Sequence, residues 1–323
     1  MLLLGYALCL LGACLLGAVA AVAAVGLFVR WAPFRAMGVP GRALAWVAGK
    51  LLRVRRAHVL ESLDRAGIEP SGATADAMYR GLGQGLFELL WVAAHPGRCL
   101  QGLMDLDREP IRQALALGRG AVVATAHTGN WDLAACAAAE AFPLTVATKR
   151  LSARWLDRIW QNVRSRRGVH LADAGRIASV AASRLSAGGL VAMLVDQAPE
   201  RTRGVVGSWF LGRVAAVDLA PALIAMRARA PIVVVFPERG PKGVQRARVL
   251  EIITPPPRPS RAWAESTMQR VTALLDRHVR QHPSEWLWMH RRWKGPLPQA
   301  GSLGLASSAQ WDGSAELLTD GSG

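Results

Sequence analysis

The chain has 323 residues, about half of them apolar, so it can bury a sizeable core in one large domain or two small ones. It carries 39 Lys and Arg residues against 23 Asp and Glu residues, a formal net charge of +16 at pH 7. This charge favours anionic partners, such as anionic lipid, a phosphorylated substrate, nucleic acid or an acidic protein. The four cysteines show no CxxC or Cys/His ligand spacing. We therefore expect neither a structural zinc site nor a disulfide framework, and no cofactor.

The N-terminal residues 2–29 contain no charged side chain, and about 20 apolar residues suffice to cross a bilayer. We predict a transmembrane anchor at residues 1–30. Arg30, Arg35 and Arg42 follow this segment and no Lys or Arg precedes it, so the positive-inside rule places the rest of the chain in the cytoplasm. A cleaved secretory signal is the alternative, since "AVAAVA" offers small residues for cleavage, but such a signal begins with a basic region and has a shorter apolar core.

The region after this segment begins with helical patterns. The basic stretch "GKLLRVRRAHVLESL" predicts either a solvated helix or one that lies on anionic headgroups. From residue 111 onward, short apolar runs alternate with amphipathic segments. Strands are predicted at 121–126, 144–148, 190–195, 232–236 and 247–253, and helices at 133–140, 153–167, 176–187, 219–229 and 262–281. This alternation predicts an α/β fold with a central mixed sheet flanked by helices.

Two further segments define the expected organisation of the chain. Between the predicted strand at 190–195 and the helix at 219–229 lies "DQAPERTRGVVGSWFLGRVAAV", and a loop of this length is usually functional or mobile. The main domain is predicted to cover residues 31–295. The tail at 296–323 is rich in Gly and Ser, has little to pack, and is predicted to be disordered.

The most informative short stretch is "ATAHTGNWDLAA", residues 124–135. It places His127 and Asp132 in the turn after a buried strand, at the edge where open α/β sheets bind ligands. Imidazole is a suitable base near neutral pH, and a carboxylate bonded to one ring nitrogen leaves the other free to take a proton from a substrate hydroxyl. The alternative is purely structural: Asp132 caps the helix and His127 binds it passively.

Four motifs resemble, in order, those of the lipid A late acyltransferases, which are lauroyl and myristoyl transferases of the lysophospholipid acyltransferase superfamily. They are "AHTGNWD", then "LVDQ" before an Arg/Gly-rich loop and "WFLGR", then "APALIAMRARAPIVVVFPER", and finally "HPSEWLWMHRRWK". The resemblance runs from the apolar N-terminus to about Lys294. It implies a glycerolipid acyltransferase-like fold and a single-pass enzyme of the bacterial inner membrane with a cytoplasmic catalytic domain. The implied reaction moves a fatty acyl chain from acyl carrier protein, or acyl-CoA, to a hydroxyl of a lipid A precursor in the membrane.

The resemblance also suggests roles for individual residues. His127 is expected to be the general base and Asp132 its orienting partner. Basic residues at strand ends often bind phosphate, and the same strand ends can orient a substrate. The expected substrate-binding residues are Asn130, Lys149, Arg150, Arg164, Asp196, Gln197, Glu200, Arg291 and Arg292.

Two departures from the common pattern leave the acceptor open. Asp132 stands where the late acyltransferases usually have Glu, and the loop after Asp196 and Gln197 is unusually rich in arginine. A lysophospholipid or phosphatidylinositol mannoside-type acyltransferase is the alternative enzyme. A non-catalytic anchored protein that binds anionic lipid is the alternative outside catalysis. Nucleic acid is not expected as a partner of a membrane-anchored chain, and the oligomeric state cannot be read from the sequence.

Overall fold

The computed structural model describes residues 2–150, 153–240 and 243–294, and the tail predicted to be disordered lies outside these residues. Its centre is a seven-stranded sheet with the strand order β1-β9-β8-β2-β5-β3-β4. β8 pairs antiparallel with β9 and parallel with β2, so the sheet is mixed, as predicted. The strands are β1 (Met104–Leu106), β2 (Ala121–Thr125), β3 (Leu144–Thr148), β4 (His170–Asp173), β5 (Leu190–Leu194), β8 (Ile232–Arg239) and β9 (Gln245–Ile253).

Helices cover both faces of this sheet. Side chains along its strands alternate between the two faces, so each face packs against its own set of helices. Val122 and Ala124 of β2 face one apolar core, which the buried sides of α8, α9 and α10 complete. Ala121 faces a second core, which contains the buried sides of α5 and α6. The helices named here are α5 (Arg108–Leu115), α6 (Trp131–Ala141), α8 (Ile177–Ser186), α9 (Ala220–Ala228) and α10 (Arg261–Gln281).

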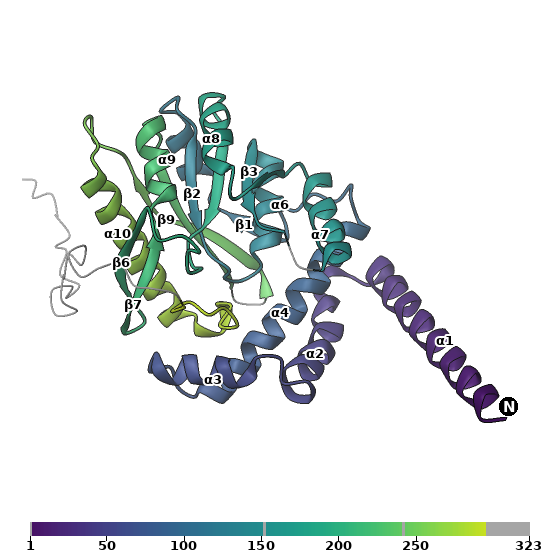
Figure 1. The fold of residues 1–323 in the computed structure, drawn as a ribbon. Coiled ribbons are helices and arrows are strands. Elements are labelled where there is room, and N and C mark those ends of the chain that lie inside the picture. The colour runs from purple at the N-terminus through teal and green to yellow at the C-terminus, as the bar shows by residue number, and fades with distance from the viewer. Residues whose placement is uncertain (1, 151–152, 241–242, 295–323) are drawn as a thin grey trace, which may run out of the picture.

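The longest helix after the N-terminal one, α4 (Ser71–Ala94), bridges these two cores. Met78 and Tyr79 belong to the first core, whereas Phe87 and Trp91 belong to the second. Figure 1 shows α4 grouped with α2 and α3 below the sheet. The remaining helices are α1 (Leu2–Trp31), α2 (Gly38–Trp46), α3 (Arg56–Arg65) and α7 (Arg154–Arg166), with short helical turns at Phe34–Met37, Val47–Leu51 and Pro283–Glu285.

The predicted strands and helices are all present, but the long predicted loop between β5 and α9 contains a hairpin. Its antiparallel strands are β6 (Val205–Phe210) and β7 (Arg213–Asp218), and they join through Leu211 and Gly212. Both turn residues have positive φ, 50° and 77°. Leu is not a residue that favours this conformation, so the usual Asn-Gly or Asp-Gly signal of a two-residue hairpin is missing. Leu211 is nevertheless buried, and Asp276 accepts a hydrogen bond from its backbone N–H at 2.8 Å.

The prediction of a transmembrane anchor at residues 1–30 is corrected. Among the residues that the structure describes, none of the helices combines the length and the apolarity needed to cross a membrane. The uncharged segment does form α1, which extends away from the rest of the chain in Figure 1. The predicted single-pass location in the bacterial inner membrane is corrected with it.

Candidate active site

The turn between β2 and α6 holds the "HTGN" residues at the carboxyl edge of the sheet. Asn130 caps α6, because its side-chain oxygen accepts a hydrogen bond from the Leu133 N–H at 3.0 Å. Gly129 has φ +52°, and a Cβ there would lie 2.9 Å from backbone atoms of Pro237 and Glu238. Only glycine fits this close approach of two chains. The turn is thus fixed against β8 before any substrate arrives.

His127, which lies in this turn, pairs with Asp196, which follows β5. Its Nδ1 lies 3.0 Å and 3.2 Å from the two carboxylate oxygens of Asp196. The strands explain the contact: β2 and β5 are parallel neighbours, with Thr125 aligned to Leu194. Both side chains lie two residues beyond that aligned pair, so they meet at the same edge of the sheet.

Asp196 is completely buried, yet it remains a carboxylate. Burial acts to raise its pKa, but the nearby His127 ring, the hydrogen bonds from His127 and Trp286, and His290 together lower the pKa to about 2. The Trp286 indole N–H donates to Asp196 Oδ2 at 3.0 Å. A carboxylate held in this way fixes the orientation of the imidazole ring and places the ring proton on Nδ1.

The second ring nitrogen of His127, Nε2, has no hydrogen-bond partner among the described residues. The side chain is 15% exposed. The Trp131 ring meets it edge-on, with centroids 5.0 Å apart, and the His290 ring lies at 5.1 Å. A neutral imidazole with one nitrogen held and the other free can accept a proton from a hydroxyl group.

Asp132 was expected to orient His127, but its described partner is Arg164 on α7. The Arg164 Nε donates to Asp132 Oδ1 at 2.7 Å, and the two side chains are only 13% and 5% exposed. Asp132 therefore joins α6 to α7 through a buried ion pair. The carboxylate that contacts His127 is that of Asp196.

His290 lies beside the pair and was not singled out from the sequence, although it stands in "MHRRWK". Gln197 donates from its amide nitrogen to His290 Nε2 at 2.9 Å. Burial, followed by the proximity of His127, lowers the pKa of His290 to about 4. A neutral His290 adds no positive charge next to the His127 ring.

Glu88 is a second site residue that the sequence analysis missed. It is 1% exposed in α4, where it stood as a single acidic residue in the apolar run "GLFELLW". Arg239 donates to both its oxygens, at 2.7 Å and 3.1 Å, and the Asn130 amide donates at 2.9 Å. A buried carboxylate is rarely found without such partners. This network holds Asn130 and thereby the start of α6.

The predicted basic residues after β3, Lys149 and Arg150, are both exposed. Lys149 forms an ion pair with Glu200 at 3.2 Å. Arg150, together with Arg154 and Arg158 of α7, lines an open depression of about 640 Å³. Asp157 and Asp173 line it too, so its wall carries both signs of charge with a small excess of positive charge.

The two arginines of "MHRRWK" have different environments. Arg291 is exposed, whereas Arg292 is 1% exposed and donates from Nη1 to the Ala216 carbonyl at 2.6 Å. The Arg292 guanidinium also lies over the Phe210 ring at 5.5 Å, and burial lowers its pKa to about 10. Arg292 thus packs the hairpin against the C-terminal segment.

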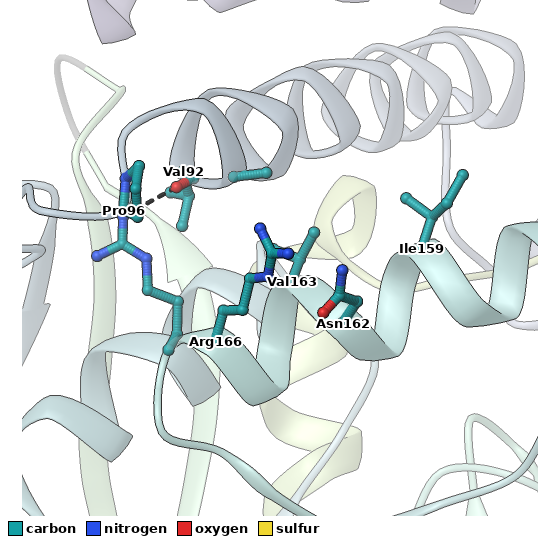
Figure 2. Close-up of a pocket in the computed structure, with 8 residues that line it drawn as sticks. Val92, Pro96, Ile159, Asn162, Val163 and Arg166 are labelled. Carbon is teal, nitrogen blue, oxygen red and sulfur yellow. Dashed lines mark hydrogen bonds between the residues drawn. The ribbon is translucent and has the colours of Figure 1, made fainter.

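A smaller, mainly apolar pocket of about 210 Å³ lies between α4 and α7, and Figure 2 shows Val92, Ile159 and Val163 lining it. Arg167 closes one end by donating to the Val92 carbonyl at 2.9 Å, the contact drawn as a dashed line. His127 lines neither this pocket nor the basic depression. The His127 turn therefore lies outside both of these hollows.

The family model for bacterial lipid A biosynthesis acyltransferases matches residues 15–295 of this chain. The match covers the whole sheet, the His127 turn and the segment that carries Trp286. A comparison with individual curated proteins gives no match. Since the family model covers well over half of the residues, the chain belongs to the bacterial lipid A biosynthesis acyltransferase family, and it is an enzyme that transfers an acyl group from a donor to a lipid acceptor.

Proposed function

We propose that this enzyme transfers a fatty acyl chain from the thioester of acyl carrier protein or CoA to a hydroxyl group of a lipid A precursor, with His127 as the general base. The observation that carries the proposal is the His127–Asp196 pair at the carboxyl edge of the sheet, with Nδ1 held at 3.0 Å and Nε2 free of partners in the described part of the chain. Family membership supports the acyl transfer and the lipid acceptor.

The proposed reaction needs one proton to move twice. The acceptor hydroxyl attacks the thioester carbonyl while His127 Nε2 removes its proton. The tetrahedral intermediate then collapses, the new ester remains, and the C–S bond breaks. The departing thiolate takes the proton back from the imidazolium, so the ring ends in its starting state. No serine or cysteine of the enzyme is needed as a nucleophile.

Asp196 is the positioning residue in this proposal. Its carboxylate holds the proton of the neutral ring on Nδ1 and stabilises the imidazolium that forms during attack. Asp132 cannot share this role in the described arrangement, since its partner is a guanidinium, which does not exchange protons at neutral pH. The Asp132–Arg164 pair connects α6 to α7 and so supports the turn that precedes α6.

The substrates we propose are anionic, which agrees with the charge of the chain. Both acyl carrier protein and CoA carry negative charge, and the formal net charge of +16 attracts such donors over a distance. Arg150, Arg154 and Arg158 line one depression at the ends of β3 and β4 and could receive a phosphorylated headgroup, because guanidinium groups bind phosphate in a bidentate manner.

The proposal is tested by acyl transfer with purified His127→Ala. Acyl carrier protein and CoA thioesters serve as donors, and a lipid A precursor, a lysophospholipid and a phosphatidylinositol mannoside serve as acceptors. Loss of the base should reduce turnover by roughly 10²–10⁴-fold. His170→Ala, an exposed histidine on β4, is the matched control and should retain activity. Near-normal turnover in a folded His127→Ala protein would overturn the mechanism, and transfer only to a lysophospholipid or mannoside acceptor would overturn the proposed acceptor.

A further inference from the structure

Three metal-binding side chains meet where β8 and α10 end. Glu238 comes from β8, His278 from the last turn of α10, and His282 from the residue that caps that helix. One ligand atom from each lies within 4.8 Å of the other two. The histidines are four residues apart, a spacing that places two side chains on one face of a helix. Neither the acyl-transfer site nor the Glu88 network uses these three residues.

His278 is buried with one ring nitrogen unused. The residue is 6% exposed, and its Nε2 has no hydrogen-bond partner in the described part of the chain. A neutral imidazole carries a lone pair on one ring nitrogen, so Nε2 is free to bind a cation when the proton is on Nδ1.

The other two members leave the cluster accessible. His282 Nε2 lies 2.9 Å from Glu238 Oε2, and the two side chains are 37% and 20% exposed. A cation could therefore enter from the solvent side, and water could occupy a fourth coordination position. In a tetrahedral zinc site, with ligands about 2.0–2.2 Å from the metal, neighbouring ligand atoms are roughly 3.4 Å apart. Small side-chain movements would bring the three atoms to that separation.

We propose that Glu238, His278 and His282 form a binding site for a divalent transition cation of the zinc class, with solvent as the fourth ligand. Two neutral imidazoles and one carboxylate form a ligand set that zinc accepts readily. An ordinary Glu238–His282 ion pair next to a core histidine is the simpler arrangement. It gives no use to the buried Nε2 lone pair of His278, and a buried polar atom without a partner costs stability.

The place of the proposed cation site in the fold indicates that a bound cation would hold the segment after α10 in position. The Glu285 carbonyl, three residues beyond His282, accepts a hydrogen bond from the Gly129 N–H at 3.0 Å. The Leu287 N–H donates to the His127 carbonyl, also at 3.0 Å. A cation bound at the start of this segment would fix it to β8 and so support the turn that carries His127.

The test is zinc binding by the full chain, purified without a polyhistidine tag and stripped with a chelator. Wild type should bind one equivalent of Zn²⁺ with a rise in Tm, and Co²⁺ in its place should give the visible absorption of a tetrahedral site. His282→Ala and Glu238→Gln should each weaken binding at least ten-fold. These two partly exposed positions are chosen because substitution of the buried His278 could prevent folding.

His170→Ala is the matched control, since it removes a histidine from β4 and should leave the affinity for Zn²⁺ unchanged. The metal-dependent change in Tm is compared within each variant, because loss of the ion pair alone can alter the baseline stability. A wild-type chain that takes up no zinc would overturn the proposal. So would uptake that survives both His282→Ala and Glu238→Gln, because the cation would then bind elsewhere. Acyl transfer is not needed as a readout, so failure here leaves the proposed function untouched.

Discussion

Asp196 and Asp132 are two buried aspartates on neighbouring elements at the same edge of the sheet, yet they have different partners. Asp196 holds an imidazole and an indole, whereas Asp132 holds a guanidinium. An imidazole can gain and lose a proton near neutral pH, and a guanidinium cannot. The comparison shows that the parallel register of β2 and β5 decides which carboxylate reaches His127.

The difference between the two aspartates is tested most directly by removing one negative charge at a time and measuring turnover. We expect Asp196→Asn to lower kcat by roughly 10²–10⁴-fold with little change in KM, since the His127 ring loses the carboxylate that fixes its proton and stabilises its charged form. Asp132→Asn should lower kcat of the folded protein much less. Equal losses in both variants, measured by acyl transfer, would contradict the assignment of the orienting role to Asp196.

The second prediction concerns stability and the ion pair between Asp132 and Arg164. Asp132→Asn leaves the buried Arg164 guanidinium without its charged partner, which should reduce the free energy of unfolding by about 3–5 kcal/mol. Urea denaturation gives the measurement. The double variant Asp132→Asn, Arg164→Gln should regain part of that loss, because it leaves no unpaired charge. If the double variant lost the sum of the two single effects, the ion pair would not be the cause.

The third prediction concerns α7, which carries the largely buried Arg164 near one end and exposed arginines near the other. Arg154→Ala and Arg158→Ala should each raise KM for a phosphorylated acceptor several-fold while kcat changes little, since they would remove uniform binding. The effect should shrink as salt rises, because exposed charges are screened. Arg119→Ala, exposed near the opposite edge of the sheet, is the control. An unchanged KM in both variants would remove the phosphate-binding role.

The smallest expected effect is a pH dependence from His290. Its pKa is lowered from 6.5 to about 4 in the folded chain, so the unfolded chain binds the proton first as the pH falls. His290 therefore costs stability progressively between pH 6.5 and pH 4. His290→Gln should make the loss of Tm over this range shallower. His278 has its pKa lowered to about 4 as well, so part of the slope should remain. An identical slope in wild type and His290→Gln would contradict the prediction.

The main elements of the fold could be predicted because they depend on local patterns. The apolar run at 121–126 and the small residues after Asp132 indicate a strand and a helix without any knowledge of tertiary contacts. The β6–β7 hairpin could not, because its turn uses Leu211, which is held at positive φ by burial and by Asp276. Such compensation by distant residues leaves no local signal.

The site was predicted only in part, for a related reason. His127 and Asp196 could be selected because each follows an apolar strand, but their pairing depends on which strands are neighbours. Glu88 and His290 come from a helix and a C-terminal segment that reach the site through packing. The cluster in which we propose a metal site could not be predicted either. His278 and His282 have a helical spacing, but Glu238 joins them only through the contact between β8 and α10.

The segment that follows α10 has a consequence for how the enzyme is made. A ribosome delivers His127 and Asp196 well before it delivers Trp286 and Leu287, whose contacts with the pair and its turn come from nearly the last described residues of the chain. The nascent sheet can form first, yet the buried Asp196 carboxylate receives its indole donor only when synthesis of this segment is finished. A chain released before Trp286 would thus have the strands and the histidine but would lack the indole donor to Asp196.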